Sequence, residues 1–288
     1  MSSWLTLVGG LTVTVLCIKL STFVRSRFTQ SELPRYIRPG TYALVTGSTD
    51  GIGKNIAKEL ARRGSNVILH GRNPSKLDAV REEVESYGVE VVIWCQEASS
   101  HPDVSSLKKL PISILVNNAA QGGTIGMFDD FTAKNIEDVI YSNSTFPTLL
   151  THYLLPSLSK PALVLNVGSL GGTVATPLMT VYSGSKAYLH LWSRGMHAEL
   201  GSQSDVVVQA VLLGGVRSNN NKLPISLSTP SSEDFAKRLC ASVSRARVIT
   251  PYLFHAIAGY FITLLPSWLA DTIVKKSVQD VVKASNNR

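Results

Sequence analysis

The sequence has few of the residues that build metal sites, disulfide frameworks or nucleic-acid surfaces. Its three cysteines, Cys17, Cys95 and Cys240, are far apart and follow no metal-ligand spacing, so they predict reduced, buried thiols. No dense run of lysine and arginine occurs, and aromatic residues are not interleaved with basic ones, which argues against nucleic-acid binding. Low-complexity segments and repeats of solenoid or propeller period are also lacking.

Charge is sparse as well: 17% of the 288 residues are charged and 44% are hydrophobic. Such a chain can bury a substantial core, as one large domain or two small ones. The formal net charge is +8. Because the basic residues are scattered or flank apolar segments, they suit anionic small molecules and membrane headgroups better than nucleic acid.

An apolar segment from Trp4 to Val24 has about the length needed to cross a bilayer, roughly 20 residues. Basic residues follow it, beginning with Arg25 and Arg27. The positive-inside tendency therefore predicts a membrane anchor in residues 1–27, with the rest of the chain in the cytosol. A cleaved signal peptide lacks a basic start and a clear cleavage site here, and a buried core helix is the other alternative.

Residues 41–70 have the pattern of a strand, a glycine-rich turn, a helix and a second strand. The turn carries Gly47, Gly51 and Gly53, which allow a sharp bend, close approach of the backbone to a pyrophosphate, and packing of helix on strand. The N-terminus of the following helix offers N–H groups to phosphates. This unit predicts a dinucleotide site.

No carboxylate stands at the end of the second strand, where NAD enzymes usually carry one for the ribose 2′-hydroxyl. The sequence there is His70-Gly71-Arg72, and the Arg72 guanidinium can hold a phosphate by two hydrogen bonds. A solvent-facing arginine in a loop is the alternative. We expect NADPH (NADP+) to be preferred over NADH.

Further along, Ser169 ends a buried-type strand, and Tyr182 and Lys186 follow four residues apart, on one face of a predicted helix. A phenol with a pKa of about 10 is a poor acid–base catalyst at neutral pH. We expect the Lys186 cation to lower the pKa of Tyr182, and Ser169 to hydrogen-bond a substrate oxygen. Chance decoration of a surface helix is the alternative, which the order of glycine turn, serine, tyrosine and lysine argues against.

The runs Thr46-Gly-Ser-Thr-Asp-Gly-Ile-Gly53 and Tyr182-Ser-Gly-Ser-Lys186 resemble the motifs of the short-chain dehydrogenase/reductase family. The resemblance extends from Arg38 to about Val282. It implies a Rossmann-type α/β fold, a doubly wound parallel sheet in three α/β/α layers, over residues 38–250. An apolar helical extension would follow in residues 251–288.

Within the family, the sequence is most similar to the membrane-bound very-long-chain 3-oxoacyl-CoA reductase and 17β-hydroxysteroid dehydrogenase group. The glycine motif through Lys54 and the segments Tyr252-Leu-Phe-His255 and Leu264-Leu-Pro-Ser-Trp268 carry this similarity. It implies location at the endoplasmic reticulum, with the catalytic domain facing the cytosol. Relatives often form homodimers, so the resemblance also allows a homodimer.

The resemblance further implies residue roles. Asn143, Ser169, Tyr182 and Lys186 would be catalytic, with Asn143 supporting a water that relays protons to Lys186. Lys186 would also hold the nicotinamide ribose, and no metal is expected. The implied cofactor-binding residues are Thr46, Gly47, Ser48, Asp50, Gly51, Ile52, Gly53, Arg72, Asn118, Tyr182, Lys186 and Val216. The N-glycosylation pattern that begins at Asn143 is rejected, because the segment lies in a helix beside the site on the predicted cytosolic side.

Some positions depart from the family pattern. Ala120 replaces a glycine, and Gln96 replaces an adenine-contacting aspartate for which Glu97 is a substitute. In the substrate loop, Leu213 takes a proline position and Ser218 a threonine position. These departures support a cofactor-binding pseudoenzyme or scaffold, whereas the complete catalytic set supports an enzyme. A nucleotide-sugar epimerase or dehydratase shares the Tyr/Lys pair but favours another glycine spacing.

The segment from Pro251 to Ala270 is almost uncharged and rich in large apolar residues. It fits a membrane-contacting helix, a lid over an apolar pocket, or buried packing and dimer surface. Because Pro266 breaks it and Gly259 lies inside it, an interfacial element is expected rather than a membrane span. The sequence as a whole predicts a membrane-attached, NADPH-dependent reductase of a lipid-like ketone, either a 3-oxoacyl-CoA or a steroid.

Overall fold

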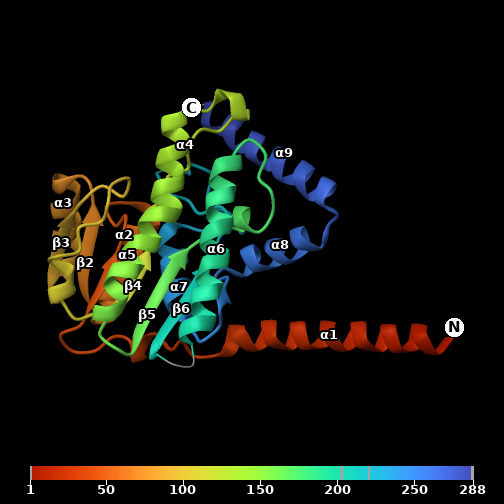
Figure 1. The fold of residues 1–288 in the computed structure, drawn as a ribbon, viewed down its shortest axis with the longest axis horizontal. Helices are drawn as coiled ribbons and strands as arrows, with labels where there is room; N and C mark the ends of the chain where they lie inside the picture. The colour runs from red at the N-terminus through yellow and green to blue at the C-terminus, as the bar shows by residue number, and fades with distance from the viewer. Residues whose placement is uncertain (1, 202–203, 220, 287–288) are drawn as a thin grey trace.

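The computed structural model describes residues 2–201, 204–219 and 221–286, which excludes Asn220 of the predicted substrate loop and the last two residues of the predicted extension. Its centre is a parallel sheet of seven strands in the order β3-β2-β1-β4-β5-β6-β7 (Figure 1). The strands are β1 (Tyr42–Val45), β2 (Asn66–Gly71), β3 (Val91–Cys95), β4 (Ile112–Asn117), β5 (Ala162–Val167), β6 (Val206–Val211) and β7 (Val248–Ile249).

Helices cover both faces of this sheet. Those before the middle of the chain are α1 (Ser2–Phe28), α2 (Gly51–Arg62), α3 (Pro74–Glu85) and α4 (Ala133–Ile140). The later ones are α5 (Phe146–Leu154), α6 (Thr180–Leu200), α7 (Ser232–Ser242), α8 (Leu253–Leu264) and α9 (Ser267–Asn286). One turn of π-helix, Tyr141–Thr145, joins α4 to α5.

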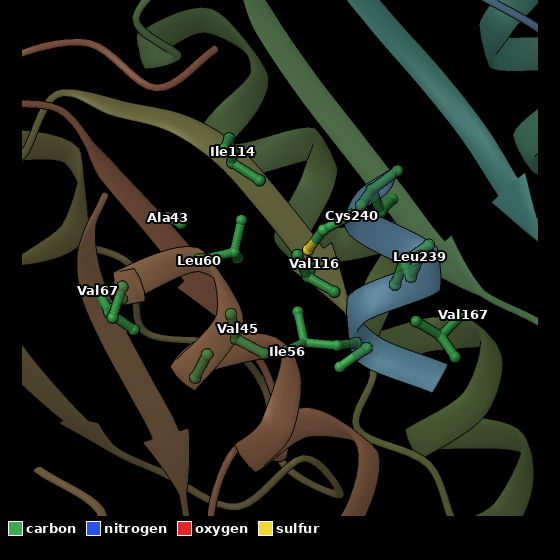
Figure 2. Packing of buried hydrophobic residues seen from close by; sticks show 14 of the residues in the cluster. Ala43, Val45, Ile56, Leu60, Val67, Ile114, Val116, Val167, Leu239 and Cys240 are labelled. Atoms are coloured by element: carbon green, nitrogen blue, oxygen red, sulfur yellow. The ribbon is translucent and has the colours of Figure 1, made fainter. Parts of the chain in front are cut away.

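Successive side chains of a strand point to opposite faces of the sheet, and this alternation divides the core into two layers. In β1, Ala43 and Val45 pack in one hydrophobic cluster with α2, α3 and α7, while Tyr42 and Leu44 pack in the other with α5. Figure 2 shows the first cluster, in which Ile56 of α2 and Leu239 of α7 lie over the sheet. The predicted three-layer, doubly wound fold is confirmed.

The strand order reverses between β1 and β4, which both lie in the middle of the sheet. In doubly wound sheets, ligands bind in the crevice outside the carboxyl ends of the strands at such a reversal. The strands predicted before the glycine turn, after the first helix, and before Asn117 and Ser169 are all present. The sequence motifs therefore meet at this one edge.

The N-terminal segment forms α1, which projects from the body of the molecule (Figure 1). Within the described part of the chain, however, no helix is both long and apolar enough to cross a bilayer. The expected transmembrane helix is corrected accordingly. The 27 residues of α1 match the expected length, but hydroxyl side chains, two glycines and Lys19 interrupt the apolar run.

The C-terminal segment forms α8 and α9, which separate at Pro266 as the sequence predicted. Large apolar side chains of α8 are exposed, among them Phe261 at 62%, and Trp268 of α9 is exposed at 68%. Buried packing therefore does not account for these exposed side chains. The prediction of buried thiols is right for Cys240 but wrong for Cys17 and Cys95, the latter being the last residue of an edge strand.

Candidate active site

The predicted cofactor turn is joined to the end of β4 by hydrogen bonds. The Thr46 hydroxyl oxygen accepts from the backbone N–H groups of Asn118 at 2.9 Å and Ala119 at 3.0 Å. In return, the Asn118 side-chain amide donates to the Thr46 carbonyl at 2.9 Å. The first glycine of the turn, Gly47, has φ +64°, a left-handed conformation that glycine adopts without strain. Thr46 and Asn118 therefore hold the turn at the strand-order reversal.

Ser48 and Asp50 also shape this turn. The Ser48 hydroxyl is buried, accepts from the His70 backbone N–H at 2.8 Å and donates to the His70 carbonyl at 3.2 Å. Its side chain therefore positions the turn rather than facing a ligand. Asp50 caps α2 by accepting from the Gly51 N–H at 2.6 Å, and it also accepts from the side-chain amide of Asn219. This contact could not be predicted from local sequence patterns, because Asn219 is 169 residues away from Asp50.

The residues at the turn fit the pyrophosphate of a dinucleotide. A Cβ on Gly47 would lie 2.9 Å from the Ala119 Cα, so only a glycine backbone fits this bend. The bend leads directly into the N-terminus of α2, where Gly51, Ile52 and Gly53 occupy the first turn. First-turn N–H groups and the helix dipole suit an anion.

Arg72, predicted to bind the 2′-phosphate, follows β2 and is paired with an acid. Its Nη1 lies 2.9 Å from Oε1 of Glu97. The two side chains are 75% and 49% exposed, so the pair is weak and can be exchanged for another anion. Gln96 instead bonds within its own loop, donating to the Ser100 hydroxyl and accepting from the Asp103 N–H. Glu97 is thus placed beside Arg72, a partner that sequence spacing did not indicate.

Ser169, Tyr182 and Lys186 come together where β5 ends and α6 begins. Ser169 lies two residues beyond β5 and hydrogen-bonds the Tyr182 side chain. The Lys186 ammonium is 5.8 Å from the centre of the Tyr182 ring and donates to the Val167 carbonyl at 2.9 Å. The Lys186 ammonium therefore lies over the Tyr182 ring, as the spacing of the two residues predicted.

The pKa of Tyr182 differs from the expectation. Burial raises the pKa of this phenol, and the hydrogen bond with Ser169 only partly opposes that rise. The expected lowering by Lys186 is therefore corrected: the ammonium is directed at the Val167 carbonyl, and burial lowers its own pKa from 10.5 to about 8. At neutral pH the phenol keeps its proton, which suits a group that donates one.

Asn143 lies in the π-helical turn between α4 and α5, with its side chain fully engaged. Its Oδ1 accepts from the Gln121 N–H at 2.8 Å, and its Nδ2 donates to the Gln121 carbonyl at 2.9 Å and the Ser185 hydroxyl at 3.0 Å. Ser185 precedes Lys186, so Asn143 positions the loop after β4 against α6. Its role in a water relay stays a prediction. Gln121 and Ser185 are members of the site that sequence reasoning missed.

The predicted substrate loop after β6 is attached to the cofactor turn and to α8. Val216 is 3% exposed and packs in the core with α7, so its side chain attaches the loop to the hydrophobic core. The His255 ring of α8 lies against this loop, with Nε2 3.2 Å from the Gly215 carbonyl and 3.1 Å from that of Ser228. The described part of the loop is thus held from two sides, despite its glycines.

Comparison with known proteins agrees with this geometry. The short chain dehydrogenase family matches residues 41–224, which is more than half of the chain. The chain belongs to the short-chain dehydrogenase family. The cofactor turn and the serine, tyrosine and lysine group all lie inside the matched region, as expected from the sequence motifs.

Individual members of the short-chain dehydrogenase family are similar over most of the chain. A very-long-chain 3-oxoacyl-CoA reductase of Kluyveromyces lactis is 32% identical over 279 residues, covering 85% of this chain and 80% of that protein. One of Anas platyrhynchos is 32% identical over 257 residues, covering 84% and 81%. A solved short-chain dehydrogenase from Sphingobium yanoikuyae in complex with NADPH is 28% identical, with a TM-score of 0.67 and coverage of 78% and 94%.

For this short-chain dehydrogenase, the buried lysine predicts a pH dependence. Because the folded-state pKa of Lys186 is about 8 and its ordinary value is 10.5, the folded protein loses this proton before the unfolded chain does. Between those values Lys186 therefore makes the protein more stable as pH rises, while its charge disappears from the site. We expect kcat to fall above about pH 8 in a profile from about pH 6 to 10. A kcat that does not change with pH, or a fall in kcat that is explained by unfolding of the protein, would contradict this prediction.

Proposed function

We propose that the chain is an NADPH-dependent reductase that converts the ketone of a lipid-like substrate, a 3-oxoacyl-CoA or a steroid, to an alcohol. The observation that carries the proposal is the grouping of the Ser169 hydroxyl, the Tyr182 phenol and the Lys186 ammonium beside the glycine turn. The names of the K. lactis and A. platyrhynchos relatives support the acyl-CoA substrate.

Each side chain has a distinct task in this reaction. NADPH, when bound, supplies the hydride for the carbonyl carbon. Tyr182 donates its phenolic proton to the carbonyl oxygen, and the raised pKa of the phenol keeps that proton in place beforehand. Ser169 donates a hydrogen bond to the same oxygen. The Lys186 ammonium provides positive charge behind the phenol as the proton leaves.

The substrate class is tested with purified full-length protein. Loss of NADPH absorbance is followed with a series of 3-oxoacyl-CoAs of increasing chain length and, separately, with steroid ketones. Turnover of long acyl chains supports the proposal in its acyl-CoA form, and turnover of steroids alone supports the steroid form. Tight NADPH binding without turnover of any ketone would instead indicate a cofactor-binding scaffold.

We further propose that Arg72 selects NADPH by binding its 2′-phosphate. Glu97 would weaken this binding by competing for the Arg72 guanidinium, since the two side chains pair at 2.9 Å. Arg72→Asp should weaken NADPH binding by about tenfold or more and leave NADH binding nearly unchanged. Glu97→Gln should strengthen NADPH binding by a few-fold, because the guanidinium no longer has to exchange partners. Dissociation constants for both cofactors measure these effects, and equal losses for NADH and NADPH in Arg72→Asp would refute the assignment.

Membrane attachment is also part of the proposal, through surface contact of α1 and α8. The α1 side chains Trp4 and Leu11 are 73% and 63% exposed, and the Thr12 and Thr14 hydroxyls donate to carbonyls of their own helix, as an apolar medium requires. Cosedimentation with phospholipid vesicles tests this: Leu11→Glu combined with Phe261→Glu should release the protein, and unchanged binding would refute it. The resemblance to membrane-bound reductases supports the endoplasmic reticulum, facing the cytosol, which immunolocalisation can check.

A homodimer is proposed from the outer face of α4, α5 and α6. A groove of about 650 Å³ lies there, lined by apolar side chains that include Phe128, Ile140 and Tyr188. Phe128 is 62% exposed, and Leu191 on the same helix as Tyr188 is also 62% exposed. Sedimentation of the full chain should give a dimer, and Leu191→Lys should shift it toward the monomer; a monomer in both would refute the proposal.

A further inference from the structure

The ring of His70 lies against the glycine turn and has no role in the function proposed above. His70 is the fifth residue of β2 and is 1% exposed. Its Nδ1 accepts a hydrogen bond from the Gly47 backbone N–H at 3.1 Å. Because Gly47 is the first glycine of the cofactor turn, this ring holds part of the turn itself, and not merely the strand beside it.

The rest of the ring lies in an apolar environment. Because Nδ1 accepts a hydrogen bond, the proton of the neutral ring is assigned to Nε2. Nε2 is buried and has no hydrogen-bond partner within the described residues. The ring centre is 4.5 Å from that of Trp94 and 5.4 Å from that of Phe146. Aromatic faces compensate a buried N–H only weakly.

A leucine or phenylalanine would fill this space without burying an unpaired N–H, which costs free energy. The position is nevertheless a histidine, so the benefit has to come from its other nitrogen, the one on Gly47. Burial also lowers the pKa of His70 to about 3. Nδ1 therefore stays an acceptor across the physiological pH range, and its hydrogen bond with the Gly47 N–H does not change with pH.

We propose that His70 is a positioning residue for the nicotinamide cofactor, whose Nδ1 fixes the Gly47 amide and with it the turn that receives the pyrophosphate. The inference rests on the proposed function, since it takes that turn to be the cofactor site. The pyrophosphate is common to NADPH and NADH, so His70 acts equally on both. This separates it from Arg72, which acts on the 2′-phosphate alone.

Two substitutions test the proposal in the full-length protein. His70→Phe keeps the aromatic volume and removes the acceptor, while His70→Asn places an amide oxygen at about the position of Nδ1. Titration followed by cofactor fluorescence should give dissociation constants for NADPH and NADH that are both about tenfold higher in His70→Phe, as expected for one lost buried hydrogen bond. His70→Asn should stay within about threefold of the wild type for both cofactors, and the loss in His70→Phe should be larger in the KM for cofactor than in kcat.

The outcomes are distinct from those that test the proposed function. Wild-type affinity in His70→Phe, equal weakening in both variants, or a loss confined to NADPH would overturn the role of His70. A wild-type protein that binds neither cofactor would instead refute the function. If His70→Phe does not fold, nitrogen NMR of the histidine-labelled wild type decides the question. An unprotonated Nδ1 that does not titrate between about pH 5 and 8 supports the proposal, and a titrating or Nδ1-protonated ring overturns it.

Discussion

Tyr182→Phe should reduce kcat by about 10²- to 10⁴-fold, the usual contribution of a positioned acid. The phenylalanine ring fills the same space but carries no proton for the carbonyl oxygen. The interaction that is lost is the hydrogen bond between the removed hydroxyl and Ser169. The fold and the glycine turn should therefore be unaffected. The measurement is kcat for ketone reduction together with the dissociation constant for NADPH, which should change little.

Tyr188→Phe is the matched control for this substitution. Tyr188 lies on the same helix, is 45% exposed, and its hydroxyl lies 3.2 Å from the Thr148 hydroxyl. Its kcat should equal that of the wild type. Undiminished turnover in Tyr182→Phe would show that another group supplies the proton.

Gly53→Ala should have the second largest effect, on cofactor binding and on stability together. A Cβ at this position would lie 2.2 Å from the Gly47 carbonyl oxygen and 2.4 Å from Nδ2 of Asn118. The Gly47 backbone and the Asn118 side chain would both have to move, so we expect cofactor affinity to fall by more than about tenfold. Overpacking of this kind costs about 1–3 kcal/mol of unfolding free energy. Cofactor titration and denaturant unfolding measure the two effects.

Gly195→Ala provides the comparison. Gly195 lies within α6, and a Cβ there would meet no heavy atom of the described residues within 4 Å, apart from the backbone of its own helix. Alanine should therefore stabilise the helix by about 0.5–1 kcal/mol and leave cofactor binding unchanged. Equal effects of the two substitutions would mean that the close approach at Gly53 does not control the turn.

Local sequence patterns predicted most of the fold, because the elements they describe are formed by neighbouring residues. The glycine turn with its helix, and the i, i+4 pair of Tyr182 and Lys186, needed no information from distant parts of the chain. Contacts between distant segments could not be predicted in the same way. Arg72 and Glu97 are 25 residues apart, and Asn143 bonds Ser185 across 42 residues.

Burial was the other quantity that spacing did not provide. A lysine one turn from a tyrosine indicated a lowered phenol pKa, but desolvation has the opposite sign and is the larger effect. The exposure of the Cys95 thiol could not be predicted from spacing either. Cys95 ends the edge strand β3, which has a neighbouring strand on one side only within the described residues. Apolar residues in α1 and α8 were recognised, but their exposure was visible only in the structure.

The π-helical turn at Tyr141–Thr145 makes the connection between α4 and α5 more sensitive to the number of its residues than to their identity. Its N–H groups bond five residues back, as between Phe146 and Tyr141, so the turn contains one more residue than an α-helical path would need. Deleting Ser144 would restore ordinary α-helical winding and remove the local widening of the helix at Asn143. The Asn143 amide would then no longer face Gln121, although Ser169, Tyr182 and Lys186 had not been replaced. A family of homologous chains should therefore tolerate exchanges in this turn far better than gaps.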